Sequence, residues 1–225
     1  MNIFAEKLSE MAKRKTKTQK SIPVIEQFDK PLEYFSIFQY LVFAGTYLYF
    51  WLFADISDAY KVYSLAMLII FEFIMVHSGI FMAIIPAKYS LLIFFPFYGI
   101  FALVFNLSLN LGDNQILILY LVTVFHRMRF AFFNTDKDIK NRLILFSVLG
   151  ALAYFILTFF SLIFSPILPY FSLDEFFFNS DAYQNVKKMK GAFVDTPHEA
   201  IIFGFLYYLA LAFINFRLLR MAKGK

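Results

Sequence analysis

The chain has 225 residues, of which 60% are apolar, 33 are phenylalanine and 16% are charged. On a water-soluble protein this composition would leave apolar patches far larger than soluble monomers tolerate, so it excludes an ordinary soluble domain. The net charge of +5 does not indicate nucleic acid as a partner, because the basic residues flank apolar runs without interleaved stacking aromatics. The composition therefore predicts an integral membrane protein whose partner is the lipid bilayer.

Six apolar runs, each near the roughly 20 residues that a helix needs to cross a bilayer, follow one another along the chain. They cover about 34–54, 62–86, 89–109, 115–133, 143–166 and 197–216. Short polar turns separate most of them, which favours sequential antiparallel packing. The sequence predicts an all-α, polytopic membrane helix bundle: a basic tail over 1–33, six transmembrane helices within 34–219, and a second basic tail over 220–225.

Lysines and arginines predict the orientation, because short loops that carry positive charge stay in the cytosol. With the N-terminus inside, cytosolic segments hold 17 of the 21 basic residues: seven before the first run, Lys88, five within 127–142 and four after 216. We therefore expect both termini in the cytosol and the protein in the cell membrane. Tyr47, Tyr49 and Trp51 are expected in the outer headgroup layer, which amphipathic rings favour.

Two segments lie outside the predicted spans. The lysine-rich N-terminal tail, with Lys13, Arg14, Lys15 and Lys17, is expected either to contact anionic lipid or to serve only as a disordered topology signal. The loop over about 170–196 contains Ser-Leu-Asp-Glu from position 172, the form of a capping box, followed by three phenylalanines. It predicts one amphipathic helix on the outer surface, as a lid or as a linker.

Glu72 is the main candidate for chemistry, because it stands near the middle of the second apolar run. A carboxylate at membrane depth must be protonated, paired or exposed to water. Gly79 and Ala83 share its helix face, and small residues mark helix contacts in membranes, so we expect Glu72 to face protein. It is either a proton or ion carrier or a structural carboxyl bonded to another helix.

Two histidines and two arginines are predicted at comparable depth. His77 points about 140° away from Glu72 on a regular helix, which makes the two poor ligands for one metal ion. His126, on the fourth run, is expected near the depth of His77, so a divalent metal site built from Glu72 and both histidines is geometrically allowed. Arg127 and Arg129 could form an ion pair with Glu72, or could reach water and only fix the topology.

The last apolar run begins with Thr196, Pro197, His198 and Glu199. Thr at the N-cap, Pro at the first position and Glu at the third form a capping box, which would account for Glu199. His198 is then expected on the outer surface, as a ligand or a pH-sensitive group.

Three function classes remain open. The first is a small proton- or ion-coupled transporter or channel that uses Glu72 and the histidines. The second is a membrane-embedded enzyme with a divalent metal held by His and Glu. The third is a structural or regulatory membrane subunit. The chain lacks cysteine, a His-Glu-x-x-His zinc helix, a Gly-x-Ser-x-Gly elbow and a phosphate-binding glycine loop.

Overall fold

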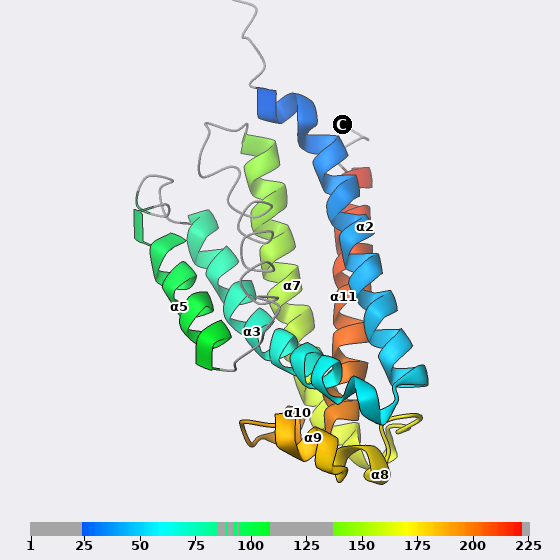
Figure 1. Cartoon of the computed structure of the whole chain (residues 1–225). Coiled ribbons are helices and arrows are strands. Elements are labelled where there is room, and N and C mark those ends of the chain that lie inside the picture. Colours follow the sequence, from blue (N-terminus) through cyan, green and yellow to red (C-terminus); the bar gives the residue numbers. More distant parts are fainter. Residues whose placement is uncertain (1–23, 85–88, 90–91, 94, 109–136, 222–225) are drawn as a thin grey trace, which may run out of the picture.

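The computed structural model describes residues 24–84, 89, 92–93, 95–108 and 137–221, and every regular element in these residues is a helix (Figure 1). The long helices are α2 (Val24–Phe53), α3 (Ala59–Ile84), α5 (Phe95–Ser108), α7 (Lys137–Phe164) and α11 (Pro197–Met221). Between α7 and α11 come the short helices α8 (Glu175–Phe178), α9 (Asp181–Val186) and α10 (Ala192–Asp195). Single 3-10 turns, Ile56–Asp58 and Ser165–Ile167, follow α2 and α7.

Three stretches of helix are long and apolar enough to cross a membrane: Lys30–Phe53, Asn141–Ile167 and Pro197–Met221. They agree with the first, fifth and sixth predicted runs. The outward side of α7 presents large apolar side chains, among them Phe155, Ile156 and Ile163, that would be costly to expose to water. These helices fit a membrane protein.

The helix α11 is the centre of the bundle. Of its spanning segment 56% is buried, against 22% for each of the segments in α2 and α7. Helices α2 and α7 run in the same direction, and α11 returns antiparallel to both (Figure 1). The ring of Tyr47 packs directly against Gly204 of α11, where an added Cβ would lie less than 3.0 Å from three of its atoms.

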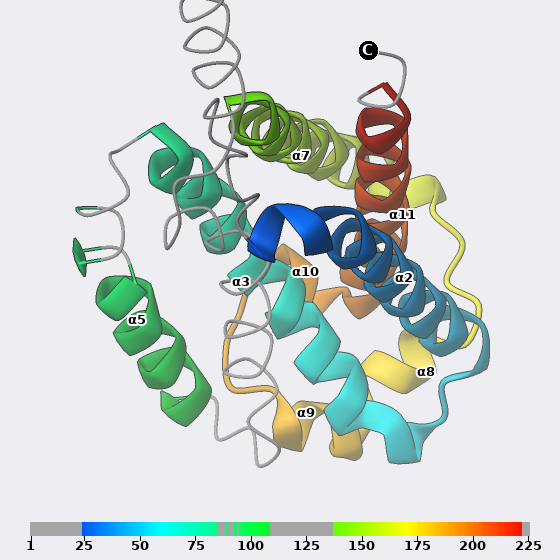
Figure 2. The same ribbon diagram turned by 90° about the horizontal axis from the view of Figure 1, so that it is seen from above.

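The helix α3 follows a different course from these three. Residues 62–69 are all buried, although a helix packed on one side buries only a stripe. Figures 1 and 2 show the reason: α3 crosses the bundle obliquely, with α7 and α11 on one side and α9 and α10 on the other. The prediction of a helix over 62–86 is confirmed within the described residues, but its first half does not run parallel to α2, α7 and α11.

Residues 165–196, which we call the cap, cover the end of the bundle at which α2 and α7 end (Figure 1). The prediction of one amphipathic helix here is wrong, because the cap forms three short helices. Asp174 caps α8 by accepting the N–H of Phe177, and Ser180 caps α9 by accepting the N–H of Tyr183. Each of these two N-cap residues begins a new short helix, so the chain changes direction every few residues.

The cap is fastened to the end of α2. Ser172, predicted as a helix cap, instead donates its hydroxyl to the carbonyl of Trp51 at 2.9 Å and accepts the N–H of Ala54 at 3.0 Å. The indole N–H of Trp51 donates to the carbonyl of Pro169 at 2.9 Å. These bonds satisfy backbone groups that the end of a helix leaves without partners, so α2 and the cap stabilise each other.

The helix α2 begins at Val24, so residues 24–33 of the predicted tail are helical. Pro31 lies inside it, and the first turns of α2 lie across the direction of the rest (Figure 1). Proline removes one helical hydrogen bond and clashes with the preceding turn, which accounts for the bend.

Candidate functional site

Three tyrosine hydroxyls, one from each spanning helix, meet one face of α3. Tyr47 of α2 donates to the carbonyl of Leu65 at 2.7 Å, Tyr154 of α7 donates to the carbonyl of Ile69 at 2.9 Å, and the hydroxyl of Tyr207 of α11 donates to Oε1 of Glu72 at 3.4 Å. Their three acceptors stand at spacings of four and three residues, which is one face of a helix. We call these bonds the tyrosine clasps.

Glu72 lies where α3 meets α7 and α11, and its side chain is 2% exposed. It faces protein, as predicted. Tyr207 is fully buried, and its hydroxyl bond to the carboxylate is long. The ring of Tyr154 packs edge-on against that of Tyr207, with ring centroids 5.2 Å apart. The ring of Tyr208 also packs edge-on against that of Tyr207, with centroids 5.5 Å apart.

This environment determines the chemistry that Glu72 can perform. A charged carboxylate is expensive to bury among aromatic rings, whereas a protonated carboxyl both donates and accepts one hydrogen bond in the same space. The group can therefore change its charge by binding or releasing a proton without a change of shape. The neighbouring hydroxyl of Tyr207 can itself both donate and accept a hydrogen bond.

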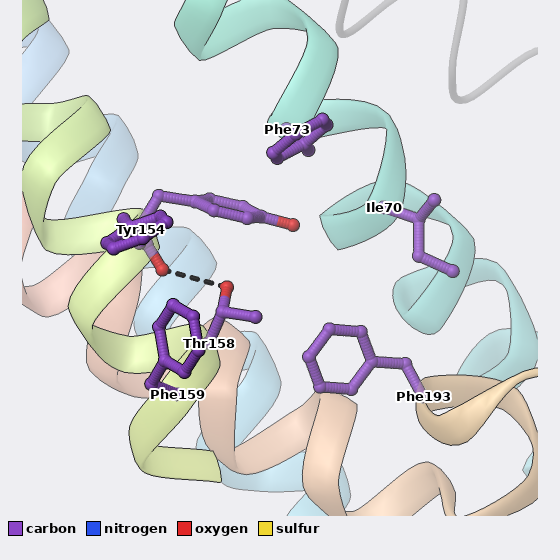
Figure 3. Close-up of a pocket in the computed structure, with 7 residues that line it drawn as sticks. Ile70, Phe73, Tyr154, Thr158, Phe159 and Phe193 are labelled. Atoms are coloured by element: carbon purple, nitrogen blue, oxygen red, sulfur yellow. Dashed lines mark hydrogen bonds between the residues drawn. The ribbon is translucent and has the colours of Figure 1, made fainter. Parts of the chain in front are cut away.

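An apolar groove of about 350 Å³ lies beside this site, between α3 and α7. Ile70 and Phe73 line it from α3, and Phe193 of α10 lies at its cap side (Figure 3). The hydroxyl of Tyr154 points toward α3, while that of Thr158 donates to the carbonyl of Tyr154 at 2.9 Å. The groove therefore offers almost no free polar group to a ligand.

The other mid-membrane candidates cannot be placed beside Glu72. His77 belongs to α3, but its side chain lies outside the described part of the chain, as do His126, Arg127 and Arg129 entirely. Within the part of the chain that is described, no three His, Asp or Glu side chains gather as a metal would require. The metal site and the ion pair with arginine stay predictions.

The capping box predicted at the start of α11 does not form. The hydroxyl of Thr196 donates to the carbonyl of Ala192 at 2.5 Å, and Oε1 of Glu199 accepts the hydroxyl of Ser165. The cap folds over this end of α11, so both side chains find partners there. His198 is fully buried against the ring of Tyr170, with centroids 4.2 Å apart, so it is not exposed at this end of the bundle, and its position on the outer side of the membrane stays a prediction.

Sequence reasoning missed two features. Tyr47 is fully buried inside the bundle, and no role was predicted for Tyr154 or Tyr207. Tyrosine in the middle of an apolar run was the available signal, because a buried hydroxyl needs a partner. The second feature is the ion pair of Glu33 with Arg142, at 3.2 Å and with side chains only 6% and 11% exposed, which joins α2 to α7.

Comparison with protein-family models, with curated proteins and with solved structures finds no match to this chain. Its function is therefore inferred from the chemistry of the site.

Proposed function

We propose that this chain is a small proton-coupled membrane transporter in which Glu72 takes up and releases the proton. The observation that carries the proposal is a carboxyl 2% exposed at the junction of three helices, in contact with the hydroxyl of Tyr207. Ionisable side chains buried at membrane depth are costly, and they are kept where protons or ions are moved. Tyr207 stabilises either protonation state of the carboxyl, because its hydroxyl can donate to the anion or accept from the acid.

Six spans with both termini in the cytosol complete the proposal, and the helix directions support an even number of spans. Since α2 ends at the cap and α7 begins at the opposite end, the chain between them must return across the bundle an odd number of times. One crossing gives four spans in total, and three crossings give the six that the apolar runs predict. Val24 and Met221 lie at the same end of the bundle in either case.

We assign this end to the cytosol on the distribution of basic residues, and the cap to the outside of the cell membrane. Arg220, whose guanidinium lies 4.4 Å from the ring centre of Phe216, belongs to the basic end of α11. The basic N-terminal tail would then contact anionic lipid of the inner leaflet. A cysteine at position 223 that reacts with an impermeant thiol reagent in sealed, right-side-out membranes would overturn this orientation.

The test of the proposal is proton binding by Glu72 in the full chain, purified and reconstituted in liposomes. Infrared spectra recorded over a pH titration should contain the C=O band of a protonated carboxyl, and Glu72→Gln should remove that band while thermal stability is retained. Glu175→Gln is the matched control, because Glu175 is an exposed carboxylate in the cap.

Proton flux into the same liposomes under an imposed potential tests the transport role directly. Flux that is lost in Glu72→Gln and kept in Glu175→Gln supports it. Full flux with Gln at position 72 refutes the proposal. A purely structural carboxyl gives a different pattern: Gln is tolerated, and Glu72→Ala costs about 1 to 3 kcal/mol by removing the acceptor of the Tyr207 hydroxyl.

A further inference from the structure

A second pair of buried polar residues lies at the cap end of α11. His198 is fully buried and Glu199 is 3% exposed. Both ring nitrogens of His198 and Oε2 of Glu199 have no hydrogen-bond partner among the described residues. Buried polar atoms in native proteins are nearly always bonded, so three such atoms together indicate a bound species.

A metal ion fits this pair poorly. No third His, Asp or Glu joins His198 and Glu199 within the part of the chain that is described, so a metal ion would lack the ligands that it requires. Water and protons fit better, because a buried water needs two to four polar partners.

A stripe of hydroxyls on α7 leads from this pair toward Glu72. Tyr154, Thr158 and Ser161 follow one another at spacings of four and three, which places them on one face of the helix, and Ser165 comes four residues later in the 3-10 turn that follows α7. Ser165 donates to Glu199 at the cap end of this stripe. At the other end the ring of Tyr154 contacts that of Tyr207, which bonds Glu72.

The hydroxyls of this stripe can still accept hydrogen bonds. Thr158 donates to the carbonyl of Tyr154 at 2.9 Å, and Ser161 donates to the carbonyl of Thr158 at 3.0 Å. Each oxygen therefore keeps lone pairs for a water. On α11, Glu199 and Tyr207 are eight residues apart, or about 12 Å along the axis. The residues of α11 between them, 200–206, are all apolar or glycine, whereas α7 carries hydroxyls at 154, 158 and 161.

We propose that Glu199 and His198 form the site through which protons from the cap side reach Glu72, along the hydroxyls of α7 and intervening waters. The step is a proton transfer: hydronium protonates the Glu199 carboxylate, and the proton passes along the stripe to the Glu72 carboxylate, leaving Glu199 charged again. Tyr170, whose ring lies against His198, covers the site on the cap side. This inference rests on the proposed function of Glu72.

The test follows Glu72 protonation in time after acidification of the cap side of liposomes that contain the full chain. In Glu199→Gln and in Ser161→Ala, the infrared band of protonated Glu72 should rise at least about tenfold more slowly than in the wild-type chain, and the final amplitude of the band should be unchanged. Ser147→Ala is the matched control for Ser161→Ala. Ser147 is also buried and on the same face of α7, but it lies beyond Tyr154, away from the cap.

The outcomes separate this inference from the proposed function. If the wild-type chain has no band that Glu72→Gln removes, the proposed function fails and this inference fails with it. If the band is present but rises at the wild-type rate in Glu199→Gln and Ser161→Ala, only the route is refuted. A smaller final amplitude that still rises at the wild-type rate refutes the route as well, since it reports damaged protein. Slow rise in Ser147→Ala also would refute it, because the effect would not be specific to the cap side.

Discussion

Gly204→Ala should be among the most damaging small substitutions in the chain, because it acts on the packing of α2 against α11. The new Cβ would lie less than 3.0 Å from three ring atoms of Tyr47, a side chain that is fully buried. Overpacking of this kind costs about 1 to 3 kcal/mol. If Tyr47 moves away, its hydroxyl also loses the carbonyl of Leu65, which adds about 1 kcal/mol. The expected loss of stability is therefore about 2 to 4 kcal/mol.

Gly45→Ala is the matched control, because an added Cβ there meets nothing within 4 Å. Alanine favours a helix over glycine by about 1 kcal/mol, so this variant should unfold at the wild-type temperature or slightly above it. Unfolding of both variants in detergent, followed by circular dichroism, measures the difference. In a Tyr47→Ala background the cost of Gly204→Ala should largely disappear. Equal stability of the Gly45 and Gly204 variants, or a Gly204→Ala cost that is unchanged without the Tyr47 ring, would refute the packing argument.

Two further predictions concern charged groups. Glu33→Gln should cost about 3 kcal/mol by breaking the buried pair with Arg142, and the double variant with Arg142→Gln should recover much of it, as thermal unfolding will measure. The backbone N–H of Gly191 and then the ammonium of Lys187 hold the pKa of Asp195 below its usual 3.8. The stability that Asp195 contributes is complete above pH 3.8 and is lost as pH falls through the lower folded pKa. The protection factors of residues 187–196 against hydrogen exchange, which are corrected for the intrinsic rate at each pH, should therefore fall in acid, and Asp195→Asn should remove that dependence.

Three of the six predicted spanning helices are found in the described residues, because the bilayer fixes how long an apolar helix must be. The first, fifth and sixth runs agree within a few residues with Lys30–Phe53, Asn141–Ile167 and Pro197–Met221. Proline at position 197 begins α11 as expected for a first helical position. These are local signals, and no contact with the rest of the chain can change them.

The course of α3 and the form of the cap could not be read in this way. An apolar run has the same composition whether the helix crosses lipid directly or passes obliquely between other helices, as residues 62–69 do. The hydroxyl of Ser172 could bond either a backbone N–H a few residues away, as a helix cap, or a group far along the chain. The sequence predicted the local bond. The bond it makes reaches Trp51, 121 residues away along the chain, and only the folded bundle brings the two together.

The three tyrosine clasps differ in one respect that bears on how Glu72 would act. Tyr47 and Tyr154 donate to backbone carbonyls, which carry no titratable proton, so neither of these two bonds is made to a group that ionises. Tyr207 alone bonds a group that ionises. The strength of that bond changes with the charge, since hydrogen bonds to an ionised acceptor are roughly twice as strong as those between neutral groups. Under the proposed function, uptake of a proton by Glu72 would weaken its bond with Tyr207, which joins α11 to the second half of α3.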